Sequence, residues 1–232
     1  MIPRVPAAVL WDLDGTLVDS ERYWISAEQR MIAAHGGVWT EADGRQLVGN
    51  TLERSAEILR AAGVRDLSLD EIIDRLVAEV HRQVVEIGVP WRPGAVELLR
   101  DLHEAGIPNA LVTMSYAENA RSIVEALPFP GFDAVISGDQ VERGKPDPQP
   151  YQLGAQALGV TASASVAIED SVTGLRSAVA AGACTIAVPN MVPLPDTADF
   201  PTWPTLAGRT TADVTAAWRD WSGSRPLGEA RR

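Results

Sequence analysis

Short apolar segments alternate with amphipathic stretches over most of this chain. The apolar segments end at glycine, proline or acidic residues, which is typical of buried strands. We predict strands at Val5–Trp11, Ile107–Val112, Ala134–Ile136, Val166–Ile168 and Thr185–Val188. Helical periodicity predicts amphipathic helices over Ala95–Ala105, Ala117–Leu127, Pro150–Leu158 and Gly174–Ala181. This alternation indicates an α/β fold: a Rossmann-like parallel sheet with helices on both faces.

Residues 19–88 interrupt the alternation, because they show helical periodicity and no strand pattern. We expect helices from Asp19 or Ser20 to Ala34, over Leu52–Ala62, and from a capping box at Ser68 and Glu71 onward. The prolines and glycine of "VPWRPGA" (89–95) end this region. The sequence therefore predicts an all-α domain, 19–88, inserted after the first strand of a core domain formed by 1–18 and 89–232. Beyond Pro189 we expect only a short helix near Ala212–Trp221.

Polar clusters follow four of the predicted strands. They are Asp12 and Asp14 after the first, Thr113 after the second, Lys145 in the loop after the third, and Glu169 with Asp170 after the fourth. The carboxyl ends of parallel strands share one edge of a sheet, so all of these residues can face one site. Carboxylates without histidine or cysteine suit Mg²⁺, and lysine and threonine are phosphate partners. A cation would also relieve the repulsion between two aspartates one residue apart.

The same residues occur in four motifs, "DLDGTLVDS", the threonine after an apolar strand, "GKPDP" and "IEDSVTGLRSAVAAG". In this order and spacing they resemble the motifs of the haloacid dehalogenase-like (HAD) superfamily. The resemblance extends from about Val5 to Asn190, and the helical insertion resembles the cap of that superfamily. It implies an enzyme that transfers a phosphoryl group through an aspartyl-phosphate, with Mg²⁺ as cofactor.

The resemblance also implies a role for each motif residue. Asp12 would be the nucleophile, and Asp14 the general acid and then the general base. Thr113, Lys145 and the backbone N–H of Met114 would hold the transferring phosphoryl group. Asp12, the backbone carbonyl of Asp14, and Asp170 would hold Mg²⁺, with Glu169 either as a further ligand or behind the ligands.

Features of the motifs favour one branch of the superfamily. Asp14 is missing from the haloacid dehalogenases, and the phosphonate-cleaving relatives use a cap lysine, which 19–88 lack. The mutases similar to β-phosphoglucomutase carry a histidine where Trp24 stands, and a lysine and an arginine where Val48 and Leu52 stand. "DSERYW" instead resembles the sugar-phosphate phosphatases.

We therefore expect a Mg²⁺-dependent phosphatase that hydrolyses a small phosphomonoester, a sugar phosphate. Candidate substrate contacts in the cap are Trp24, Asn50, Thr51 and Arg54. Two alternatives stay open: a phosphotransferase similar to β-phosphoglucomutase, and a non-catalytic regulator that binds a phosphometabolite. Retention of Asp12, Asp14 and Lys145 counts against the regulator.

Composition limits the partners. A formal charge of −11 and a pI of about 4.7 oppose binding to a nucleic-acid backbone. No apolar run approaches the roughly 20 residues of a membrane span. The single cysteine, Cys184, excludes an internal disulfide. We expect a cytoplasmic protein, a monomer or weak dimer, whose partner is a small phosphorylated metabolite. Its histidines (His35, His81, His103) are expected to be surface or structural residues.

Overall fold

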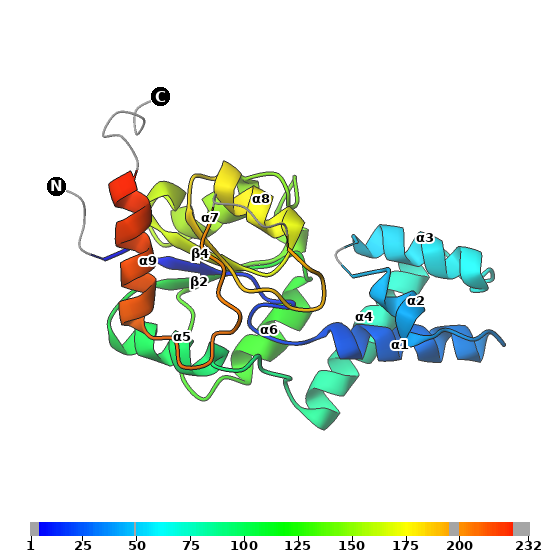
Figure 1. Cartoon of the computed structure of the whole chain (residues 1–232). Coiled ribbons are helices and arrows are strands. Elements are labelled where there is room, and N and C mark those ends of the chain that lie inside the picture. The colour runs from blue at the N-terminus through cyan, green and yellow to red at the C-terminus, as the bar shows by residue number, and fades with distance from the viewer. Residues whose placement is uncertain (1–4, 49, 195–199, 225–232) are drawn as a thin grey trace.

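A parallel sheet forms the centre of the computed structural model, which describes residues 5–48, 50–194 and 200–224 (Figure 1). Its strands are β1 (Val9–Trp11), β2 (Asn109–Val112), β3 (Ala134–Ile136), β4 (Val166–Glu169) and β5 (Cys184–Ala187). They are ordered β3-β2-β1-β4-β5, and every pairing is parallel. The predicted α/β fold is confirmed. The outer limits predicted for the core domain, residues 1 and 232, lie outside the described ranges.

Helices cover both faces of this sheet. One face carries α7 (Gln149–Ala157) and α8 (Val172–Ala180). The other carries α5 (Ala95–Glu104), α6 (Ala117–Glu125) and α9 (Thr211–Ser224). Two short 3₁₀ turns, η1 (Gly138–Gln140) and η2 (Ala162–Ala164), complete the connections. Each strand is only three or four residues long, so the edge where the strands end lies close to the first turns of the helices that follow.

The two faces pack differently. On the α7 and α8 face the buried residues include many alanines, and α7 comes close to the sheet at Gly154. A Cβ added at Gly154 would lie 2.6 Å from a methyl group of Val112. The opposite face carries large side chains, among them Trp11, Leu98 and Trp218. Small residues therefore let α7 lie close to the strands whose ends carry the polar clusters.

The helical cap consists of α1 (Glu21–Ala34), α2 (Glu41–Arg45), α3 (Leu52–Ala62) and α4 (Leu69–Ile87), and it stands beside the core in Figure 1. The predicted capping box begins α4: the Ser68 hydroxyl accepts from the Glu71 N–H, and the Glu71 carboxylate accepts from the Ser68 N–H. The cap packs through one buried stripe of α4: Ile72, Ile73, Leu76, Val80 and Val84. The boundaries 19 and 88 stay a prediction.

Two adjacent linkers join the cap to the core. Val18 and Trp91 form an antiparallel bridge, and the Asp19 N–H donates to the Pro90 carbonyl over 2.7 Å. The side chain of Arg92 donates to Asn190, whose amide donates to Asp19 over 3.3 Å. The chain therefore leaves the core and returns to it at one place.

Several expectations about the elements differ from the structure. The first strand begins at Val9 rather than Val5, because Val5 is exposed and Pro6 has no N–H to donate to a ladder. The helix α2 was not predicted; it is only five residues long and begins with a capping box of Thr40 and Asp43.

The segment beyond Pro189 contributes more to the core than expected. Thr202 forms a bridge with Ala187, and Trp203 and Leu206 are buried. The final helix, α9, also extends past the predicted Ala212–Trp221 at both ends. None of the helices in the described ranges combines the length and apolar character that crossing a membrane needs.

We predict that Gly154→Ala lowers the free energy of unfolding by about 1 kcal/mol. Overpacking against Val112 costs about 1–3 kcal/mol, which exceeds the gain of about 1 kcal/mol in helix propensity. Denaturant unfolding would measure the change, and the cost should shrink in a Val112→Ala background. As a matched control, Gly223→Ala in α9 meets open space and should stabilise the protein. Equal stability of Gly154→Ala and wild type would contradict the close packing of α7.

Candidate active site

The predicted residues meet at the carboxyl edge of the sheet. Asp12 follows β1, Thr113 follows β2, and Glu169 is the last residue of β4, the strand beside β1. The loop before α7 brings Lys145 to the same edge. Asp12, Lys145, Glu169 and Asp170 form one cluster, while Asp14 and Thr113 form a second cluster next to it.

Lys145 is the only lysine in the chain, and its side chain is 4% exposed. Its Nζ lies 2.6 Å from Asp12 Oδ1 and 2.6 Å from Glu169 Oε1, and it also donates to the Val112 carbonyl over 3.0 Å. Burial lowers the pKa of Lys145, but the charges of Asp12 and Glu169 outweigh it, so its pKa lies above the ordinary value. The ammonium is therefore a fixed positive charge between two carboxylates.

Glu169 is fully buried, and both of its carboxylate oxygens have donors. Oε1 accepts from Lys145 Nζ and, over 2.9 Å, from the Tyr151 hydroxyl. Oε2 accepts from the N–H groups of Asp170 and Ser171 and from the Ser171 hydroxyl, over 3.0–3.1 Å. The side chain thus holds Lys145 on one side and the start of α8 on the other.

Asp12 has a free acceptor that a cation would need, and Asp170 Oδ1 accepts a long hydrogen bond of 3.5 Å from the Thr16 hydroxyl. Asp12 Oδ2 is buried and has no hydrogen-bond partner in the described part of the chain. Burial and the charge of Glu169 raise the pKa of Asp12 to about 7, and burial and the charge of Asp12 raise that of Asp170 well above its ordinary value. One oxygen from each of Asp12, Glu169 and Asp170 lies within 4.8 Å of the others. An all-oxygen set with an unpartnered buried oxygen fits Mg²⁺.

Gly15 lets the chain turn beside Asp170. Its φ is +92°, and a Cβ added there would lie 2.0 Å from an Asp170 carboxylate oxygen. Only glycine combines this backbone conformation with so close an approach. The glycine of "DLDGT" therefore brings the first motif against the last.

Hydroxyl groups fix Asp14. Ser20 donates to Oδ1 over 2.5 Å, and Ser115 donates to Oδ2 over 2.5 Å. Thr113 lies 3.4 Å from the same Oδ2, and its hydroxyl accepts from the Ser115 N–H. Ser20 precedes α1, but its hydroxyl binds Asp14 instead of capping that helix as expected. Met114 lies between Thr113 and Ser115 and is 37% exposed.

Sequence reasoning missed three of these side chains: Ser20 and Ser115 on Asp14, and Tyr151 on Glu169. Tyr151 is fully buried in α7, and Lys145 Nζ lies 4.9 Å from the centre of its ring. The sequence pointed to two of these residues only by their closeness to predicted site residues: Ser115 is two positions after Thr113, and Tyr151 is six positions after Lys145.

Within the described residues, the hydrogen bonds of the four cap candidates do not reach the carboxylate cluster. Thr51 caps α3 by accepting from the Arg54 N–H, and Arg54 pairs with Glu57 at 2.7 Å. Asn50 donates to the Gln46 carbonyl over 3.4 Å. Trp24 is half-buried against the hydrophobic core. Their role as substrate contacts stays a prediction.

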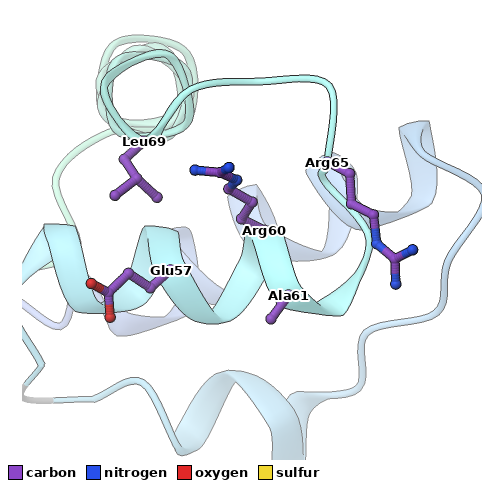
Figure 2. A pocket seen from close by; sticks show the side chains of 5 residues that line it. All are labelled: Glu57, Arg60, Ala61, Arg65 and Leu69. Carbon is purple, nitrogen blue, oxygen red and sulfur yellow. The ribbon is translucent and has the colours of Figure 1, made fainter.

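A separate hollow of about 560 Å³ lies on the cap, at α3 and the start of α4 (Figure 2). Its lining residues are Glu57, Arg60, Ala61, Arg65 and Leu69. Arg60 and Leu69 extend into the space between the two helices, whereas Arg65 extends away from it. The hollow contains none of the predicted site residues, so it is distinct from the carboxylate cluster.

The three histidines make contacts away from the carboxylate cluster. His35 lies 3.0 Å from Asp66, and His103 stacks at a tilt on Phe129. The Nδ1 atom of His81, in α4, lies 3.1 Å from the Ser122 hydroxyl in α6. None of these hydrogen bonds or ring contacts involves the carboxylate cluster.

Comparison with known proteins shows which family and which relatives this chain matches. A family model described as "Haloacid dehalogenase-like hydrolase" matches residues 9–188. Hexitol phosphatase A of Escherichia coli is 35% identical over 183 residues, 77% of this chain and 81% of that protein. The phosphorylated carbohydrates phosphatase of Thermotoga maritima is 33% identical over 177 residues, 75% of this chain and 81% of the relative.

Solved structures agree with these matches. CbbY from Rhodobacter sphaeroides, in a mutant complex with xylulose-1,5-bisphosphate, superposes with a TM-score of 0.81 at 28% identity. The match covers 90% of this chain and 99% of that one. β-Phosphoglucomutase from Clostridium difficile is 17% identical and shares the fold, with a TM-score of 0.78 over 94% of this chain and all of that one.

The burial of Lys145 can be tested chemically. An amine-reactive reagent should modify the N-terminal amine of the folded protein and leave Lys145 unmodified, because its ammonium is buried and paired with two carboxylates. After denaturation the same reagent should modify both amines, which peptide mass spectrometry would resolve. The N-terminal amine serves as the internal control. Modification of Lys145 in the folded protein at the rate of the N-terminus would show that the ion pairs do not persist.

Proposed function

Because the chain belongs to the haloacid dehalogenase-like hydrolases, we propose that it is a Mg²⁺-dependent phosphatase that hydrolyses a small phosphomonoester of a sugar or polyol. The observation that carries the proposal is the buried Lys145 between Asp12 and Glu169, beside an Asp12 oxygen without a partner. In this arrangement Asp12 could attack the phosphorus atom of a phosphate group that a cation and Lys145 bind.

In the proposed reaction a carboxylate oxygen of Asp12 attacks phosphorus, and the bond from phosphorus to the leaving alcohol oxygen breaks. Asp14 gives its proton to that oxygen. Asp14 then takes a proton from water, whose oxygen attacks the aspartyl-phosphate and releases inorganic phosphate. The hydroxyl groups of Ser20 and Ser115 orient the Asp14 carboxylate for both steps.

Binding of the phosphate is assigned to Lys145, the hydroxyl of Thr113 and the backbone N–H of Met114. Mg²⁺ would be held by Asp12, Asp170 and the backbone carbonyl of Asp14, and when bound it offsets the charge of the phosphate. We assign Glu169 to positioning Lys145 rather than to the metal, because both of its oxygens already accept hydrogen bonds.

The substrate class rests on the relatives. The two phosphatases reported above act, by their names, on hexitol phosphates and phosphorylated carbohydrates, and the CbbY complex contains a sugar bisphosphate. A cap joined to the core by two adjacent linkers suits small substrates, because it can cover them during the reaction. Trp24, Asn50, Thr51 and Arg54 remain our candidates for contacts with the sugar.

Phosphate release by the purified protein tests the proposal directly. The assay would compare Mg²⁺ with EDTA across sugar phosphates, polyol phosphates, nucleotides and an aryl phosphate, with β-glucose 1-phosphate included. Mg²⁺-dependent release is the expected result. Conversion to glucose 6-phosphate without release would instead support a mutase, and binding of phosphometabolites without turnover would support a regulator.

We predict that Asp12→Asn lowers turnover by about 10³-fold or more, since an amide oxygen is a poor nucleophile. The substitution keeps the size of the side chain and an acceptor for Lys145, so circular dichroism and thermal unfolding should still report a folded protein. Normal turnover by the folded variant would contradict the nucleophile assignment.

Asp14→Asn should affect substrates according to their leaving groups. General acid catalysis contributes about 10²–10⁴-fold, and an aryl phosphate needs it least because its leaving group is a weak base. We expect a rapid burst of one equivalent of the phenol, then a stall at the aspartyl-phosphate for lack of a base. The first turnover of a sugar phosphate should be slow. Rapid-quench measurements would show both; equal slowing of the two first turnovers would argue against proton donation by Asp14.

A further inference from the structure

The helix α4 of the cap faces the helix α6 of the core. The two helices pack together, and the His81 ring and the Ser122 hydroxyl lie 3.1 Å apart across this contact. Asp70 and Asp74 precede His81 by eleven and seven residues, so all three lie along one face of α4. The face of α4 that meets the core therefore carries two carboxylates near its N-terminal end.

Those carboxylates lie near Tyr116, the residue that directly precedes α6. Asp74 is seven residues before His81 and Tyr116 is six before Ser122, so each lies about 9–11 Å from the contact, toward the N-terminal end of its helix. Burial is the largest cause of the raised pKa of Tyr116. The charges of four carboxylates raise it further, in agreement with this placement: Glu53, Asp139, Asp74 and Asp70. We call these four carboxylates the acidic rim.

The acidic rim adjoins the catalytic residues. Tyr116 directly follows Ser115, whose hydroxyl donates to Asp14 over 2.5 Å. Asp139 accepts from the Ala117 N–H over 3.1 Å, which fixes one member of the rim at the start of α6. We therefore expect a leaving group that accepts its proton from Asp14 to extend toward Tyr116 and the carboxylates of the cap and the core around it.

Acidic residues outnumber basic ones in the cap. The only lysine is already paired with Asp12 and Glu169. The segment 19–88 contains thirteen acidic residues and eight arginines, a formal charge of −5. Arg54, the arginine nearest to Glu53 in sequence, pairs with Glu57.

We propose that the acidic rim restricts this enzyme to phosphomonoesters whose leaving group carries no second phosphate or carboxylate. The inference rests on the phosphatase proposed above and narrows its substrate class. The phosphate that reacts is balanced at Lys145 and the cation site, whereas a second anion would meet the carboxylates of the rim. This distinguishes the chain from CbbY, whose solved complex contains xylulose-1,5-bisphosphate.

The test compares fructose 6-phosphate with fructose 1,6-bisphosphate, which differ by one phosphate. At low ionic strength we expect kcat/KM to favour the monophosphate by about tenfold or more, and added salt to reduce the preference. The double variant Asp70→Asn/Asp74→Asn should raise kcat/KM for the bisphosphate by about fivefold and change that for the monophosphate less than twofold. Both positions are exposed, so the fold should persist.

Glu97→Gln/Glu104→Gln provides the matched control. These two residues are exposed on α5, a helix of the core, and their replacement changes the net charge by the same amount. The control should leave the preference unchanged. An equal gain from both double variants, or a wild type that prefers the bisphosphate, would overturn the role of the rim while leaving the phosphatase in place. Failure to release phosphate from any substrate, the aryl phosphate included, would overturn both proposals.

Discussion

The ammonium of Lys145 lies between two buried carboxylates, and the arrangement of the site depends on this interaction. Removing Asp12 and Glu169 from water is costly, and the lysine compensates only part of it. Asp170 adds a third carboxylate, so the cluster keeps an excess of negative charge. Burial first and this excess of negative charge second raise the pKa values of Asp12 and Asp170. A divalent cation would complete the balance, which links the charge of the cluster to its proposed chemistry.

The close approach of α7 to the sheet supports this cluster. Gly154 and the alanines on that face let α7 lie near the strands, and Tyr151 of α7 reaches Glu169 as a result. Gly15 plays the corresponding part in the first turn, where it allows Asp170 to approach. Residues that carry no chemistry themselves thus determine how near the charged groups come to one another.

Much of the fold and of the site could be predicted because the signals are local. Short apolar runs that end at Asp12, Thr113 and Glu169 mark strands, and parallel strands place their ends at one edge. The contacts of Ser115 with Asp14 and of Tyr151 with Glu169 join residues 101 and 18 positions apart, and no periodic pattern encodes them. The segment from Pro189 to α9 was missed for a similar reason, since Trp203 and Leu206 become core residues only through tertiary packing.

The bridge between Val18 and Trp91 has a consequence for how such an enzyme can diversify. The cap begins and ends at two hydrogen-bonded positions, so the core already holds the ends of the intervening chain together. Replacing the cap with a helical segment of another length would change the entropic cost of loop closure only slightly, because this cost grows slowly with loop length. The cap's part of the surface around the leaving group can therefore evolve separately from the edge of the sheet that carries the carboxylate cluster.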